Sequence, residues 1–246
     1  MSQGSEQSLT STKGAWFEKT HWSIVLAAKN SASPEAMNEV CRAYWRPLYQ
    51  YIKREGYTKA DAQDLTQKFF VHLLAKDFLA YLKHQDGKFR SFLLKFLKHF
   101  LADERDKAAA QKRGGDRVFV SFDEFETEER CGFEPKDNLT PDQVFDRRWA
   151  ETLMEQAEGR LQREYTTRGK QALYEALKNL GVAERETYAQ IGKRLGMSES
   201  AIKSAMRQLR QRHQAILIEE IERTVGRPEE VEDERRHLMN VVGAGR

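Results

Sequence analysis

Residues 187–212 read TYAQIGKRLGMSESAIKSAMRQLRQR, and the spacing of their apolar residues predicts two short amphipathic helices joined by a glycine turn. Thr187 is placed to cap the first helix, with Gln190 three residues later completing a capping box. Gly196 ends that helix, because glycine adopts the left-handed turn conformation without steric cost. Ser198 then caps the second helix. The pattern is that of a helix-turn-helix, which places its second helix in the major groove of DNA.

The two predicted helices each have an apolar face and a polar face. The apolar residues are expected to pack the helices together: Tyr188, Ile191, Leu195, Ile202, Ala205, Met206 and Leu209. The polar face is basic, because residues 187–212 hold six Lys and Arg against the single acid Glu199, a net charge of +5. Such a face attracts the phosphates of DNA. The candidate DNA-contacting residues are Ser198, Ser200, Lys203, Ser204, Arg207, Arg210 and Arg212. A solvated helical hairpin is the alternative interpretation.

The composition of the 246-residue chain predicts an almost entirely α-helical protein. Hydrophobic residues make up 39%, which is enough for real cores, and the chain has only five prolines. Apolar residues recur every three to four positions through long segments, and no convincing series of strands occurs. The expected fold class is all-α, with two compact helical domains.

Cysteine usage and the N-terminus predict where the protein works. The two cysteines, Cys41 and Cys131, have nothing near metal-ligand spacing, which argues against a disulfide framework or a zinc site and favours a reducing cytoplasm. Residues 1–14 lack an apolar signal core, and no apolar run approaches the roughly 20 residues that span a bilayer. We therefore expect a cytoplasmic protein with no membrane insertion and no cofactor.

Charge is distributed unevenly along the chain, although its net value is only +3. Residues 1–113 carry a net +7, residues 114–146 a net −7 and residues 147–225 a net +4. Two basic blocks around an acidic connector are typical of two DNA-contacting modules joined by a strap that does not bind DNA. The expected parts are a disordered N-terminus (1–19), a first helical domain (20–113), a weakly structured acidic linker (114–141), a second helical domain (142–225) and a C-terminal extension of no evident role (226–246).

Three helices are predicted in the first basic block, over residues 34–56, 59–76 and 88–107. Their expected buried residues are Met37, Val40, Cys41, Tyr44, Leu48 and Tyr51 in the first, Leu65, Phe69, Phe70, Leu73 and Leu74 in the second, and Phe89, Leu93, Phe96, Leu97 and Phe100 in the third. The second helix leaves a polar edge of Asp61, Asp64, Gln67 and Lys68 in water. The third leaves Arg90, Lys95, Lys98, His99 and Arg105 outside.

These segments resemble the sigma-70 family of bacterial RNA polymerase sigma factors, in its extracytoplasmic-function group. The family pattern D-A-x-D-L-x-Q-x-x-F is matched by Asp61, Ala62, Asp64, Leu65, Gln67 and Phe70. The pattern F-R-x-[FW]-L is matched by Phe89, Arg90, Phe92 and Leu93, and the ending I-K-S-x-x-x-x-L-R by Ile202, Lys203, Ser204, Leu209 and Arg210. The chain departs from the family at Lys68, where Glu is usual, and at residues 171–180 (QALYEALKNL), which replace the usual L-P-x-x-x-R lead-in.

The resemblance implies a protein that does no covalent chemistry, but binds core RNA polymerase, directs it to promoter DNA and opens the duplex. It implies a polymerase-docking edge of Asp61, Asp64, Gln67, Lys68 and Phe70. It implies contacts to the −10 element by Tyr81, His84, Gln85, Phe89, Arg90, Lys95, Lys98, His99, Arg105, Lys112 and Arg113. The helix-turn-helix would contact the −35 element, and an anti-sigma protein is an expected inhibitory partner.

Other classes of function remain as alternatives. A nuclease would need clustered carboxylates around a metal, and the only tight group, Asp103, Glu104 and Asp106, occupies neighbouring helical positions that face different ways. A stand-alone helix-turn-helix regulator would explain residues 187–212 but not the docking pattern. An interaction protein with sigma-like surfaces, sequestered by a regulator, is a third possibility. Binding to core polymerase without DNA distinguishes the sigma factor from a lone regulator.

Overall fold

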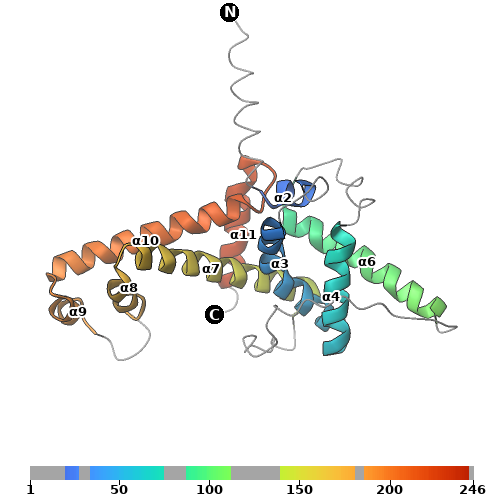
Figure 1. Ribbon diagram of the computed structural model, residues 1–246, viewed down its shortest axis with the longest axis horizontal. Helices are drawn as coiled ribbons and strands as arrows, with labels where there is room; N and C mark the ends of the chain where they lie inside the picture. Colours follow the sequence, from blue (N-terminus) through green and yellow to red (C-terminus); the bar gives the residue numbers. More distant parts are fainter. Residues whose placement is uncertain (1–19, 28–33, 75–86, 112–138, 181–185, 244–246) are drawn as a thin grey trace, which may run out of the picture. The chain divides into compact units, whose positions relative to one another are not determined.

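The structure is a computed structural model, which describes residues 20–27, 34–74, 87–111, 139–180 and 186–243 (Figure 1). Within these residues the secondary structure consists of nine α-helices and one 3-10 helix, with no β-strand. A single isolated antiparallel bridge joins Lys88 and Val225 in this part of the chain. The predicted all-α fold is confirmed for the described residues.

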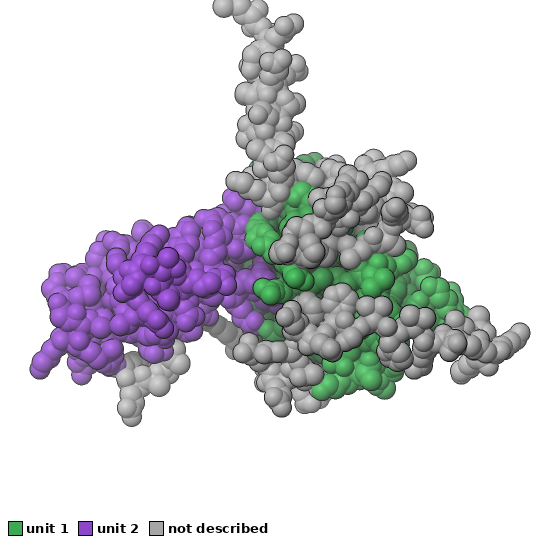
Figure 2. Space-filling model, in the orientation of Figure 1, with its two compact units in different colours: residues 1–151, 223–246 green, residues 152–222 purple. Residues whose placement is uncertain are grey.

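The chain divides into two compact units (Figure 2): unit 1 comprises residues 1–151 and 223–246, and unit 2 comprises residues 152–222. These bounds differ from the predicted ones. The first boundary falls inside helix α7 (Pro141–Thr167) rather than in the acidic segment, and residues 223–246 belong to unit 1. The predicted linker therefore lies within the sequence bounds of unit 1, and most of it, residues 114–138, is outside the described residues.

Unit 1 is built on helices close to those predicted in the first basic block. They are α3 (Pro34–Arg54), α4 (Lys59–Leu74) and α6 (Phe89–Gln111), joined by α2 (His21–Ala27) and the first residues of α7. An aromatic cluster occupies the core, where the Phe89 ring meets Trp22 edge-on at 5.0 Å between ring centroids and Tyr44 at 5.3 Å. Apolar positions at helical spacing thus converge on one core.

Most predicted buried positions in unit 1 are confirmed. The buried residues among them are Val40, Cys41, Tyr44, Leu48, Tyr51, Leu65, Phe69, Phe70, Leu73, Phe89, Leu93, Leu97 and Phe100. Phe96 is half-buried, and the side chains of Met37 and Leu74 lie outside the described part. The expected solvent position of Arg90 is wrong, because its exposed fraction is only 7%.

The C-terminal segment adds two elements to unit 1, η3 (Pro228–Glu230) and α11 (Val231–Gly243). Pro228 at the start of η3 and three acids in the first turn of α11 are residues that favour a helix start. Leu238 of α11 is fully buried. This segment is a structural part of unit 1, although sequence analysis assigned no role to residues 226–246.

Unit 2 contains the remainder of α7, α8 (Gln171–Lys178), α9 (Tyr188–Leu195) and α10 (Glu199–Glu222). Its helix-turn-helix core unites Ala176 and Leu177 of α8 with Ile191 of α9 and with Ile202, Ala205 and Met206 of α10. Residues 171–180, which replace the lead-in usual in sigma factors, therefore supply the third helix that packs on the helix-turn-helix.

Candidate nucleic-acid interface

The first helix of the helix-turn-helix begins and ends as the sequence predicts. Thr187 Oγ1 accepts a hydrogen bond from the Gln190 backbone N–H at 3.3 Å, and Gln190 Oε1 accepts one from the Thr187 backbone N–H at 2.7 Å. This is the predicted capping box. α9 ends at Gly196, whose φ of 65° is left-handed. These bonds give partners to backbone groups at both ends of the two-turn helix and mark where it begins and ends.

The turn between α9 and α10 is closed by a backbone hydrogen bond, and it leaves no room for a side chain at Gly192. The Met197 backbone N–H donates to the Gly192 carbonyl at 2.8 Å. A Cβ atom on Gly192 would lie 2.6 Å from the Met197 carbonyl oxygen, which is too close for any other residue at the present backbone geometry. Ser198 Oγ then accepts from the Ala201 backbone N–H at 3.2 Å and caps α10. Ser198 is therefore engaged in holding the helix start.

The outer face of α10 presents the predicted polar residues to solvent. Ser200, Lys203, Ser204, Arg207 and Arg210 are all exposed. Within the described residues, Arg207 and Arg210 form no ion pair or side-chain hydrogen bond, so their charges are available to a ligand. Lys203 Nζ lies 2.6 Å from Glu199 Oε1, and the hydrogen bond and charge of Glu199 raise the pKa of Lys203.

Arg212 differs from the other arginines of α10. Its guanidinium donates through Nη2 and Nε to the two oxygens of Glu164 at 2.6 and 2.8 Å, and through Nη1 to Glu219 at 3.0 Å. The hydrogen bond from Arg212 holds the pKa of Glu164 below its ordinary value. Arg160 of α7 pairs with Glu219 and Glu220 of α10. Arg212 thus belongs to a network that joins α7 to α10 within unit 2, and we leave it out of the interface.

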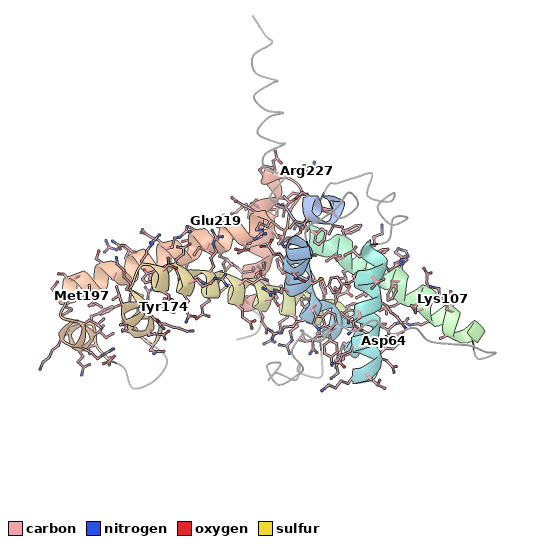
Figure 3. All side chains as sticks on the ribbon, viewed as in Figure 1. Asp64, Lys107, Tyr174, Met197, Glu219 and Arg227 are labelled. Atoms are coloured by element: carbon pink, nitrogen blue, oxygen red, sulfur yellow. The ribbon has the colours of Figure 1, made fainter. Side chains whose placement is uncertain are left out.

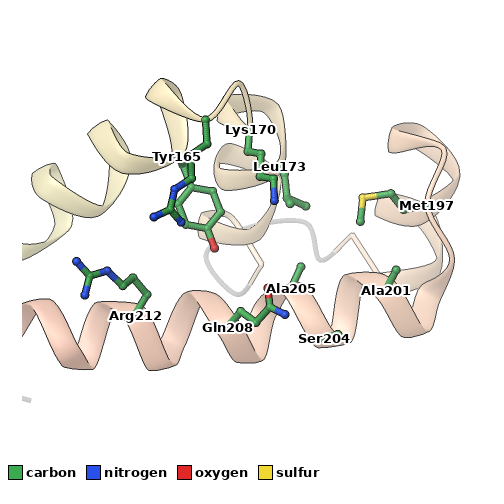
Figure 4. Close-up of a pocket in the computed structure, with 10 residues that line it drawn as sticks. Tyr165, Lys170, Leu173, Met197, Ala201, Ser204, Ala205, Gln208 and Arg212 are labelled. Atoms are coloured by element: carbon green, nitrogen blue, oxygen red, sulfur yellow. The ribbon is translucent and has the colours of Figure 1, made fainter.

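A cavity of about 340 Å³ opens beside α10 (Figure 4). Its apolar lining comes from Leu173, Met197, Ala201 and Ala205, and its polar lining includes Tyr165, Arg168, Lys170, Ser204 and Gln208. Arg168 and Lys170 are exposed cations at the turn between α7 and α8, and neither forms an ion pair with another described residue. They add positive charge beside the exposed face of α10 in the same unit.

A second basic surface lies on α6 in unit 1. Lys95, Lys98, His99 and Arg105 are exposed, as predicted. Lys98 Nζ lies 2.7 Å from Asp142 of α7, and Arg105 donates to Glu55 at 2.6 Å and to the Tyr57 hydroxyl at 3.0 Å. Lys95 and His99 have no ion-pair partner among the described residues. The charge of this surface is therefore partly neutralised by neighbouring acids.

Phe89 and Arg90 are placed in the core rather than on the basic surface. Phe89 is fully buried in the aromatic cluster. Arg90 donates from Nη1 to Asp146 at 2.8 Å and from Nε to Glu234 at 2.6 Å. Arg90 is held by these two carboxylates, and Phe89 is held by the aromatic cluster. We therefore include neither residue in the candidate interface. The other −10 candidates, Tyr81, His84, Gln85, Lys112 and Arg113, lie outside the described residues.

The predicted polymerase-docking edge lies on α4, where Figure 3 labels Asp64. Asp61 and Lys68 are exposed, and Asp64 and Gln67 are half-buried. Lys68 Nζ pairs with Asp64 at 2.8 Å, one helical turn away, and Asp61 accepts from Thr58 Oγ1 at 2.7 Å at the helix start. Phe70 is buried and stacks on Trp45 with 6.0 Å between ring centroids. The edge therefore presents four polar side chains, with Phe70 beneath them as core.

The described residues contain neither a metal-binding cluster nor a membrane-spanning helix. No group of three or more His, Cys, Asp or Glu is placed there to hold a metal ion. Of the three acids weighed for a nuclease, Asp103 and Asp106 are exposed and Glu104 pairs with Lys107 at 2.9 Å. Among the helices in the described ranges, none has the length and apolar character needed to cross a membrane.

The sequence reasoning missed the acids that hold the arginines. Glu234 and Asp146 bind Arg90, and Glu164 and Glu219 bind Arg212. The helical pattern of residues 231–243 could have indicated α11, but that pattern does not show that Glu234 binds Arg90. Comparisons with known proteins assign no family: no family model, no curated protein and no solved structure matches the chain.

Proposed function

We propose that the protein is a sigma factor of the sigma-70 family, extracytoplasmic-function group, which binds core RNA polymerase, directs it to specific promoters and promotes duplex opening. The observation that carries the proposal is the capped pair α9 and α10, whose outer face offers the unpaired cations Arg207 and Arg210. A rigid second helix with exposed cations is what docking into a major groove requires. The three sequence motifs in family order support the polymerase-binding half of the proposal.

The proposed contacts to the −35 element divide by position along α10, because the N-terminal residues of a recognition helix lie nearest the base edges. Ser200, Lys203, Ser204 and Arg207 are the residues proposed to contact base edges. Arg210, together with Arg168 and Lys170 beside the cavity, contacts phosphates and sets the register without reading sequence. Lys203 would break its ion pair with Glu199 to contact a base or a phosphate. The free-energy cost is small, because an exposed ion pair of this kind is weak.

The proposed roles in unit 1 rest on α4 and α6. The α4 edge of Asp61, Asp64, Gln67 and Lys68 docks on polymerase. Lys95, Lys98 and His99 on α6 contact phosphates near the −10 element. Opening of the duplex takes place in the cytoplasm, and an anti-sigma protein that covers these surfaces is the proposed inhibitory partner.

Co-purification with core polymerase in the absence of DNA tests the proposal. We expect the full chain to bind, and Asp64→Ala with Gln67→Ala to lose binding while keeping its melting transition, since both side chains are partly solvent-exposed. The matched control is Asp103→Ala, which removes an exposed carboxylate from α6. Failure of the full chain to bind core polymerase would rule out a sigma factor.

A stand-alone helix-turn-helix regulator is the second candidate. It is favoured by unit 2, which contains a complete hydrophobic core, both caps and the exposed cations without help from α4 or α6. This candidate requires tight, sequence-specific DNA binding by the isolated chain, and no binding to core polymerase.

A further inference from the structure

The segment that follows α10 forms backbone hydrogen bonds at the start of α6. The Phe89 N–H donates to the Thr224 carbonyl at 2.8 Å, and the Gly226 N–H donates to the Gly87 carbonyl at 3.1 Å, on either side of the bridge between Lys88 and Val225. Thr224 and Val225 are fully buried. Chain segments more than a hundred residues apart are therefore joined by one antiparallel bridge inside unit 1.

Helix α2, the first in the described part of the chain, is hydrogen-bonded to both sides of this bridge. The His21 N–H donates to the Arg223 carbonyl at 2.8 Å, and Trp22 Nε1 donates to the Gly87 carbonyl at 3.1 Å. Arg223 also pairs with Glu39 of α3. The C-terminal segment therefore contacts α2 and α3 through Arg223. It contacts the start of α6 through Thr224 and Val225.

A buried ion cluster continues the contact into α11. Glu234, fully buried, accepts from Arg90 Nε at 2.6 Å and Nη2 at 3.2 Å, and Lys88 Nζ lies 3.2 Å from the same carboxylate. The third nitrogen of Arg90, Nη1, donates to Asp146 at 2.8 Å, and His237 Nε2 lies 3.1 Å from the other Asp146 oxygen. The Arg90 guanidinium lies 5.0 Å from the ring centroid of Trp149.

This geometry restrains Arg90 on every side. A two-bond fork to Glu234 fixes the plane of the guanidinium, and Asp146 fixes its remaining edge. Removing one partner from a buried pair leaves an uncompensated charge, which strongly destabilises the arrangement. Arg90 is the second residue of α6, so the cluster sets the direction in which that helix begins.

We propose that Glu234 is a positioning residue for promoter opening: through Arg90, the C-terminal segment holds the first turn of α6 so that the exposed face of that helix meets the separating DNA strands. The inference rests on the proposed function, because it takes from there both the opening of the duplex by this protein and the contacts of α6 near the −10 element. It gives residues 223–243 a task that the sequence did not reveal. Glu234 itself contacts no DNA.

The test uses the full chain with core polymerase on a promoter that carries 2-aminopurine in the −10 element, whose fluorescence rises when the base unstacks. Glu234→Gln is expected to lower the opening rate on fully paired DNA by roughly 10²-fold, the size of effect that a 1 Å misplacement causes. A promoter melted beforehand at the −10 element should restore most of the activity. Binding to core polymerase should stay within about twofold of the original chain, a factor too small to reflect a lost contact.

The controls separate positioning from simple loss of stability. Glu232→Gln removes an exposed α11 carboxylate that pairs with Arg235 and should change nothing. Asp146→Asn removes the half-buried partner of Arg90 and should give an intermediate defect even if Glu234→Gln folds poorly. Hydrogen exchange at the first turn of α6 should accelerate in Glu234→Gln and Asp146→Asn but not in Glu232→Gln.

The outcomes are distinguishable. If the original chain opens no promoter, the proposed function falls and this inference falls with it. If the original chain opens promoters and both Glu234→Gln and Asp146→Asn open them at the same rate, only the inference is wrong. An increase in opening rate would also overturn it, because it would make the C-terminal segment an inhibitory cover.

Discussion

At the scale of single residues, Gly192 occupies a position in the helix-turn-helix where the backbone leaves no room for a Cβ atom. A Cβ there would lie 2.6 Å from the Met197 carbonyl, a backbone atom that cannot rotate away. Gly192→Ala should lower the free energy of unfolding by about 1–3 kcal/mol, measured by denaturant titration. The matched control is Gly159→Ala on α7, where a Cβ would meet nothing within 4 Å and helix propensity favours alanine. Equal losses in both variants would contradict the steric account.

His21 gives unit 1 a specific pH dependence. Burial, with a further contribution from the charge of Arg223, lowers its pKa from 6.5 to about 3. Between these values the unfolded chain binds a proton that the folded chain does not, so the stability contributed by neutral His21 is complete above pH 6.5 and is lost as the pH falls towards 3.

We therefore expect the free energy of unfolding to fall from pH 6.5 to pH 4.5 by roughly 1 kcal/mol per pH unit from this residue. His21→Gln removes the titrating group, so its stability should depend less steeply on pH over the same range. Urea titrations of both proteins at half-unit intervals measure the slopes. Identical slopes would show that His21 is not the group responsible.

At the scale of elements, α10 carries arginines in two different environments. Arg207 and Arg210 are exposed and have no ion-pair partner in the described part of the chain, whereas Arg212 is bound by Glu164 and Glu219. Arg207→Ala with Arg210→Ala should weaken promoter binding in the polymerase complex, with no change in melting. The slope of log K against log salt should fall by about 1, because only Arg210 of the two is proposed to contact a phosphate. Arg212→Gln should instead lower stability by about 1 kcal/mol, since solvent screens a half-exposed pair.

Fluorescence anisotropy on a labelled promoter at several salt concentrations checks the DNA-binding part, and thermal melts check the stability part. Arg163→Ala is the matched control, because it removes an exposed arginine of α7 in the same unit. If Arg163→Ala reduces the salt slope as much as the double variant does, the effect comes from the overall charge of unit 2. It then gives no support for an interface on α10.

The elements that sequence reasoning predicted well are those specified by local signals. Thr187, Gln190 and Gly196 lie within ten residues of one another, and their capping and turn chemistry needs no tertiary partner. The positions of Arg90 and Arg212 could not be predicted in this way. Their carboxylate partners lie 144 and 48 residues away, and a charged residue at helical spacing looks the same in the sequence whether it faces water or a buried acid.

At the scale of the whole molecule, the chain passes from unit 1 to unit 2 inside α7 and returns to unit 1 after α10. A chain ending at residue 222 would leave Arg90 without Glu234 and the Phe89 N–H without the Thr224 carbonyl. We expect this truncation to remove hydrogen-exchange protection from α2 and the first turn of α6, and to leave α9 unchanged. A chain ending at residue 243 is the control. Intact protection of α6 in the shorter chain would contradict the structural role of the C-terminal segment.

We propose that this chain confers promoter specificity on core RNA polymerase. Run-off transcription from genomic fragments, with purified core polymerase and the full chain, measures that property directly. We expect discrete transcripts that require the chain, disappear with Arg207→Ala plus Arg210→Ala, and persist with Arg163→Ala. Transcripts that are the same with and without the chain, or tight sequence-specific DNA binding by the chain without polymerase, would contradict the claim.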